Sequence, residues 1–144
     1  MPTPPSRARR WLLAALAGGL LAFLLGAGWR EVGLRALAED WRRAHAAGDL
    51  AAMEALYCWD GVAPEQRRRL RLALAQELEL PVTAVRAARL APPDQLLGTA
   101  QRPNLKPIGV IEVSFAVNDG LGARLLAGRS GLGFRLVVLI PSGS

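Results

Sequence analysis

The single histidine, the single cysteine and the carboxylates are the residues with which this chain could do acid–base or nucleophilic chemistry. His45 could act as a general base if a carboxylate such as Asp60 oriented it, but no local pattern fixes either residue. A thiol becomes a nucleophile beside basic groups, and none adjoins Cys58 in the sequence. The favoured roles are therefore packing for Cys58 and a packed or helix-end position for His45, with His45 and Asp60 as weak catalytic candidates.

Metal and cofactor motifs are not found in the sequence. One Cys and one His exclude a Cys/His zinc site built by this chain alone, and a single Cys excludes an internal disulfide. The patterns HExxH, GxSxG, Walker A and the EF-hand loop do not occur. We therefore expect no metal and no cofactor, and an enzyme is the less favoured reading.

Aromatic and basic side chains are the candidates for binding. Trp41, Tyr57 and Trp59 could line a ligand pocket, although core packing is the commoner use of such residues. Four arginines cluster where a helix is expected to begin, and could bind phosphates, lipid headgroups or an acidic partner: Arg67, Arg68, Arg69 and Arg71. Cations at the start of a helix are unfavourable for its dipole, which favours a binding role for these arginines. A charged face exposed to solvent is the ordinary explanation.

The composition fits one globular domain. The chain has 144 residues, 51% of them hydrophobic, and a formal net charge of +6. Arg7, Arg9 and Arg10 in the basic tail 1–10 supply half of that charge, and residues 30–144 carry a net +3. This is too little to predict a nucleic-acid partner.

Residues 11–29 form an uncharged apolar run, with Trp11 and Trp29 at its ends as membrane anchors. As a helix the run would measure about 28 Å, close to the hydrocarbon thickness of a bilayer. We expect a single-pass anchor, with the lipid bilayer as a partner. A cleaved signal peptide, which would give a secreted or periplasmic domain, is the alternative, although the run is longer than a usual signal core.

The basic tail favours a cytoplasmic N-terminus and a domain outside the cytoplasm, periplasmic or extracellular. Small residues recur every four positions within the run and could let two such helices approach closely as a homodimer: Ala14, Gly18, Ala22 and Gly26. An Ala/Gly-rich chain also produces such a stripe by chance.

The domain over residues 30–144 is predicted to be α+β. Helical periodicity covers 31–47, 50–58 and 64–80, with Gly48, Asp49, Pro64 and Pro81 as the stop and start signals between them. Alternation then predicts strands at 82–90, 111–117, 121–127 and 132–140, with a loop at 91–107 and turns at 118–120 and 128–131. We expect three helices packed on one face of a roughly four-stranded antiparallel sheet.

One segment resembles the opening of NTF2-like (SnoaL-like) domains. It consists of Trp41-Arg-Arg-Ala44, Ala47-Gly48-Asp49-Leu50, Met53, Leu56-Tyr57 and Asp60. The match covers about twenty residues, and the later strands fit in outline. The resemblance implies a cone-shaped domain with a pocket between helices and sheet. It implies no activity, since that fold serves enzymes, ligand binders and interaction modules.

These observations predict a membrane-anchored, non-catalytic binding or interaction module, whose partner is an unidentified protein or small ligand. The alternative from a different class is a small NTF2-like pocket enzyme that uses His45 with a carboxylate.

Overall fold

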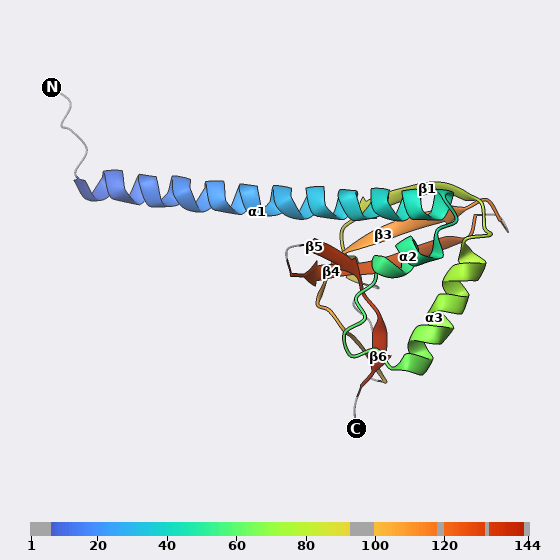
Figure 1. Cartoon of the computed structure of the whole chain (residues 1–144). Coiled ribbons are helices and arrows are strands. Elements are labelled where there is room, and N and C mark those ends of the chain that lie inside the picture. Colours follow the sequence, from blue (N-terminus) through green and yellow to red (C-terminus); the bar gives the residue numbers. More distant parts are fainter. Residues whose placement is uncertain (1–6, 93–99, 118–119, 132, 143–144) are drawn as a thin grey trace. The chain divides into compact units, whose positions relative to one another are not determined.

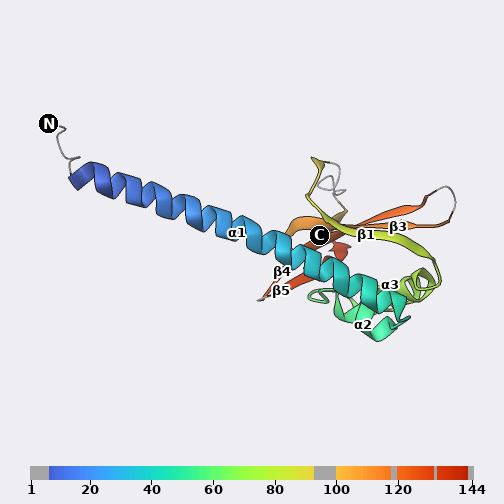
Figure 2. The same cartoon turned by 90° about the horizontal axis from the view of Figure 1, so that it is seen from above.

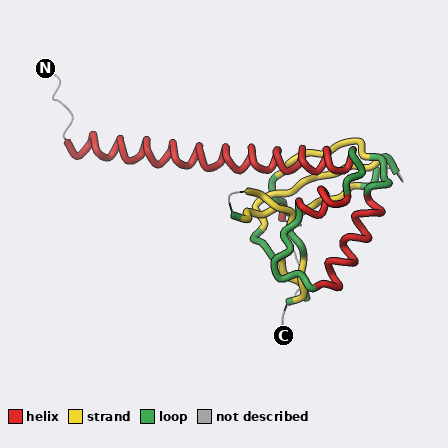
Figure 3. The backbone as a smooth tube through the Cα atoms, in the orientation of Figure 1, coloured by secondary structure: helices red, strands yellow, loops and turns green. Residues whose placement is uncertain are grey.

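The computed structural model describes residues 7–92, 100–117, 120–131 and 133–142; for residues 7–25 and 27 only the helical backbone is described. The chain divides into two units, Met1–Val32 and Gly33–Ser144. The elements are α1 (Arg7–Ala46), α2 (Leu50–Ala55), α3 (Pro64–Glu77), β1 (Val82–Ala88), β2 (Gln101–Pro103), β3 (Pro107–Phe115), β4 (Gly122–Ser130), β5 (Gly133–Leu136) and β6 (Leu139–Pro141). Helices come first along the chain and strands follow (Figure 3).

The second unit is α+β, as the sequence predicts. Its main sheet is a curled, four-stranded antiparallel sheet with the order β1-β3-β4-β5 (Figure 1). A two-stranded sheet pairs β2 with β6. Alternate residues of β3, namely Ile111, Val113 and Phe115, are almost fully buried on one face of the main sheet.

The helices of the second unit bury their apolar stripes against that face. One core cluster contains Leu34 and Trp41 of α1, Met53 of α2, Leu74 of α3 and the buried residues of β3. The view from above shows α2 and α3 close to the C-terminal end of α1 (Figure 2). The core therefore lies between the three helices and one face of the curled sheet.

The breaks between the helices follow local chemistry. Gly48 adopts φ +62°, a left-handed conformation that costs glycine little, and it ends α1. Asp49 caps α2, because its side chain accepts a hydrogen bond of 2.9 Å from the amide of Ala52. Pro64 stands in the first turn of α3, as predicted.

The predicted C-terminal ends of the second and third helices were wrong. The second helix stops at Ala55, since the next residues pair with Leu136: its amide donates to Leu56 O (2.7 Å), and the Cys58 amide donates to Leu136 O (2.9 Å). The third helix ends at Glu77 instead of residue 80, before the residues that Pro81 disfavours in a helix.

The strand predicted over 132–140 is two strands in two sheets. Residues 128–130, predicted as a turn, continue β4 and pair with β5. The amide of Val137 still donates to Leu126 O of β4 (2.8 Å), and the chain then leaves the main sheet. The Asn104 amide donates to Val138 O (3.0 Å), and the Val138 amide donates to Asn104 Oδ1 (2.9 Å). The segment predicted as a loop supplies β2, whose partner is β6.

In the part of the chain described with side chains, no helix is long and apolar enough to cross a membrane. The predicted anchor 11–29 lies mostly outside that part, as do Trp11, Ala14, Gly18 and Ala22. Of the anchor candidates, Gly26 and Trp29 are described, and Trp29 is 75% exposed.

Candidate functional site

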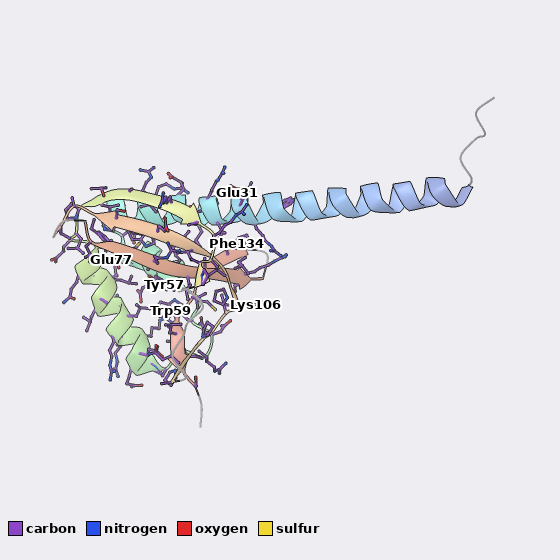
Figure 4. All side chains as sticks on the ribbon, turned by 180° about the vertical axis from the view of Figure 1, so that it is seen from behind. Glu31, Tyr57, Trp59, Glu77, Lys106 and Phe134 are labelled. Atoms are coloured by element: carbon purple, nitrogen blue, oxygen red, sulfur yellow. The ribbon has the colours of Figure 1, made fainter. Side chains whose placement is uncertain are left out.

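A pocket of about 630 Å³ lies between α3, β4 and residues 137–139. One stripe of α3 faces it, because Gln66, Arg69, Leu70 and Ala73 recur at helical spacing. Apolar side chains supply most of the opposite wall, among them Leu126, Val137 and Leu139. Tyr57 also lines the pocket, and Figure 4 shows it with Trp59 beside α3.

The four arginines of α3 have different surroundings. Arg67 lies over the ring of Trp59, 4.5 Å from its centroid. Arg68 pairs with Glu65 at 2.9 Å, and Arg71 lies 3.6 Å from a carboxylate oxygen of Glu54.

Arg69 differs from these three. It lines the pocket, and among the residues that the structure describes it has no ion-pair partner. Arg124 on the opposite wall is bound to Glu112. Of the predicted arginine cluster, Arg69 is therefore the one whose cation is available to a molecule in the pocket.

Gln66 lines the same pocket, and its side-chain amide is held by a hydrogen bond to the chain at Leu139. Its amide must turn the nitrogen toward Leu139 O, because a carbonyl accepts hydrogen bonds and does not donate them. The other end of the amide, Oε1, is buried and has no partner among the described residues. An unpaired buried acceptor lowers the stability of the folded state.

Tyr57 is the aromatic residue of the pocket lining, and Trp59 lies next to it but does not line the pocket. Their ring centroids are 5.9 Å apart, and Trp59 Nε1 donates to Glu54 O at 2.9 Å. Burial, with a smaller contribution from the charge of Glu77, raises the pKa of Tyr57 above its usual value. The phenol therefore stays protonated and keeps its hydrogen-bond donor.

His45 and Trp41 lie elsewhere, at a second hollow of about 560 Å³ between α1 and residues 78–85. The centroids of the two rings are 4.9 Å apart, and the rings stack. His45 Nε2 lies 3.1 Å from Glu77 O, and because a carbonyl only accepts hydrogen bonds, the imidazole is the donor. Trp41 is fully buried, and its Nε1 has no partner within the described chain.

Asp60 and His45 are not joined by a hydrogen bond or ion pair in the described residues. Asp60 is exposed, and its backbone carbonyl accepts from Asn104 at 3.1 Å. Cys58 is buried with a free thiol. Among the residues that the structure describes, no group of three or more His, Cys, Asp or Glu could hold a metal ion.

Two polar residues at the ends of α3 were missed by the sequence reasoning. Gln66 lies three residues before Arg69, a spacing that places both on one helix face. Glu77 has a buried Oε1 without a partner in the described part of the chain, and burial raises the pKa of its carboxyl. The helical spacing could have revealed Gln66, whereas nothing in the sequence marks Glu77 as buried.

The chain matches no protein-family model, and comparisons with curated proteins and with solved structures found no match.

Proposed function

We propose that residues 33–144 are a non-catalytic module that binds a small ligand in the pocket between α3 and β4, and that residues 11–29 tether it to a membrane. The observation that carries the binding role is the pocket itself. Its walls are mostly apolar, and its few polar groups come from one face of α3, from Tyr57 and from Arg124 of β4. Ligand sites commonly combine these two properties.

The rest of the proposal is supported by the sequence. The uncharged run flanked by tryptophans supports the tether, and the basic tail supports a domain outside the cytoplasm. An NTF2-like architecture is supported by the segment from Trp41 to Asp60 and agrees with helices packed on a curled antiparallel sheet.

Occupancy of the pocket can be tested with 1-anilinonaphthalene-8-sulfonate, an anionic apolar dye whose fluorescence rises in apolar surroundings. The full-length chain would be reconstituted in phosphatidylcholine nanodiscs and titrated, with empty nanodiscs subtracted. We expect a saturable signal from the wild type. Ala73→Trp should abolish that signal, because the indole would fill the pocket from an exposed position on α3.

Leu72→Trp is the matched control. Leu72 is the preceding residue of α3, is 68% exposed and does not line the pocket. This variant should bind the dye like the wild type. No saturable signal above empty nanodiscs, or an equal signal from Ala73→Trp, would contradict the proposed site.

A further inference from the structure

Two close contacts show at which end of the main sheet the chain enters the second unit. A Cβ at Gly33, the first residue of that unit, would clash with the ring of Phe134 in β5. The next residue, Leu34, lies against Gly109 of β3, where a Cβ would clash with the leucine side chain. Residues 33–34 therefore pack at the end of the sheet where β3 and β5 begin and β4 ends.

Three basic residues gather at this end of the sheet. Arg129 of β4 is the cross-strand partner of Phe134, and Arg135 of β5 is paired with Gly128. The backbone oxygen of Lys106 would lie 2.7 Å from a Cβ at Gly128. Because neighbouring strands lie about 4.8 Å apart, the three residues start from adjacent positions of the backbone. We call Lys106, Arg129 and Arg135 the basic rim, and Figure 4 shows Lys106 and Phe134 at this end of the sheet.

The charge of the basic rim is not compensated within the described structure. All three side chains are exposed, and none has an ion-pair partner among the described residues. Arg129 Nε donates to Gly131 O at 3.4 Å, and this acceptor is neutral. The sequence contains no Asp or Glu over residues 95–111 or 120–144. The basic rim is therefore a surface of one sign, which favours an anionic partner.

Chain connectivity keeps this surface close to the membrane, if residues 11–29 span it. Only residues 30–32 separate the run from Gly33, and the charges of Arg30 and Glu31 cancel. Even when fully extended, the four peptide links from the end of the run to Gly33 reach about 14 Å. That reach is comparable to the Debye length of about 8–10 Å, so the basic rim stays within range of the surface potential of anionic lipids.

We infer that the basic rim binds the anionic headgroups of the membrane in which residues 11–29 anchor the chain, and that this contact holds the entry end of the domain against the lipid surface. Arg and Lys bind phosphate oxygens through charge-assisted hydrogen bonds, and each cation near an anionic surface adds to the attraction. This inference rests on the proposed tether and adds the class of lipid that the domain recognises.

A fluorescent label beside the basic rim tests the inference in the full-length chain. Gly133 precedes Phe134 in β5, and a Cβ there would meet nothing within 4 Å, so Gly133→Cys provides an attachment point. Cys58→Ala removes the other thiol. The labelled chain would be reconstituted in nanodiscs that contain phosphatidylcholine with a spin-labelled headgroup, which quenches a fluorophore at close range. We expect quenching to be about twofold stronger when about one third of the lipid is phosphatidylglycerol than in phosphatidylcholine alone.

Two triple variants with the same loss of charge assign the contact. Lys106→Gln, Arg129→Gln and Arg135→Gln together should reduce quenching with phosphatidylglycerol to the level in phosphatidylcholine alone. The matched control replaces three arginines of α3 with glutamine and should keep the twofold difference: Arg67, Arg68 and Arg71. If the rim variant fails to fold, Arg129→Gln and Arg135→Gln, tested singly, should each remove part of the difference.

The outcomes separate the basic rim from the tether. If the chain enters phosphatidylcholine nanodiscs but quenching is equal with and without phosphatidylglycerol, the basic rim binds no anionic lipid and the tether stands. The same holds if both triple variants lose the difference, because net charge alone would then explain it. If the chain does not enter phosphatidylcholine nanodiscs, the tether and this inference both fail.

Discussion

At the scale of residues, burial decides which polar groups can respond to pH. Glu77 is the clearest case, since desolvation raises the pKa of its carboxyl above 4.5 and one oxygen is buried without a partner among the described residues. The folded state therefore holds the proton to a higher pH than the unfolded state does.

The sign of the pH effect follows from that difference. Below the unfolded pKa both states are protonated and Glu77 costs nothing. As the pH rises from there through the raised folded pKa, the unfolded state ionises first and stability falls. Glu77→Gln should therefore melt at a higher temperature than the wild type at pH 8, with a smaller gap at pH 5.

The measurement is thermal unfolding of the full-length chain, followed by tryptophan fluorescence between pH 5 and pH 8. Glu79→Gln, an exposed carboxylate two residues away, is the control and should follow the wild type. An identical pH dependence in Glu77→Gln and the wild type would show that the Glu77 carboxyl is solvated when the chain is folded.

His45 belongs to the packing of α1 against the end of α3. Its ring stacks on Trp41 and its Nε2 bonds to Glu77 O, away from the α3 pocket. We expect His45→Ala to lower the melting temperature while dye binding is unchanged in the folded protein. If His45→Ala at normal stability and abundance abolished a cellular function of the protein, the pocket enzyme would replace the binding module.

At the scale of elements, β4 approaches the backbone of residues 105–106 closely at Gly128. A Cβ at Gly128 would lie 2.7 Å from the backbone oxygen of Lys106 and 3.0 Å from Leu105 Cβ, whereas one at Gly133 would meet nothing within 4 Å. Gly128→Ala should therefore destabilise the protein by about 1–3 kcal/mol, because backbone must move. Gly133→Ala in the same hairpin should be close to neutral, as measured by denaturant unfolding; equal losses would contradict the steric explanation.

Asn104 ties three segments together. Its side-chain amide donates to Cys58 O at 2.7 Å and to Asp60 O at 3.1 Å, and its carbonyl accepts from the amide of Val138 at 2.9 Å. Asn104→Ala should lower the free energy of unfolding by about 1–3 kcal/mol, since partly buried partners lose their bonds. The bonds from Asn104 hold the segment that carries Tyr57 and Trp59, which lie near one another in Figure 4. Because Tyr57 lines the pocket, the same variant should weaken dye binding.

Gln101→Ala is the control for Asn104, because Gln101 is exposed in the same stretch of chain. Asn104→Asp keeps the acceptor for Val138 and loses the donor to two carbonyls. A stability equal to that of the wild type in Asn104→Ala would show that water replaces these bonds without cost.

At the scale of the whole molecule, we expect the uncharged run over residues 11–29 to set the location of the protein. We expect the full-length chain in the membrane fraction after a carbonate wash, and an alkaline phosphatase fused after Ser144 should be active. Leu21→Arg should shift the chain toward the soluble fraction, because a cation near the centre of a membrane helix costs about 2.5–3.5 kcal/mol on insertion scales. A soluble wild-type product that begins near Trp29 would instead establish a cleaved signal peptide.

The sequence by itself determined that the domain is α+β, with helices first and the strands of an antiparallel sheet after them. Gly48, Asp49 and Pro64 act within one helical turn, so their effects follow from neighbouring residues alone. The alternation over residues 111–117 likewise marks one apolar face, because successive side chains of a strand point to opposite sides. These local rules predicted an α+β domain with an antiparallel sheet.

Only the tertiary structure decided which distant segments meet. Leu136, the last residue of β5, also bonds to residues 56–58, and Val138 lies outside the main sheet because Asn104 takes up its backbone bonds. Packing also places Arg67 over Trp59 and Arg71 near Glu54, and it leaves Arg69 at the pocket beside Gln66. Periodicity indicates which face of an element is apolar, whereas the partners of Asn104 and Gln66 lie far away in the chain, where no local pattern encodes them.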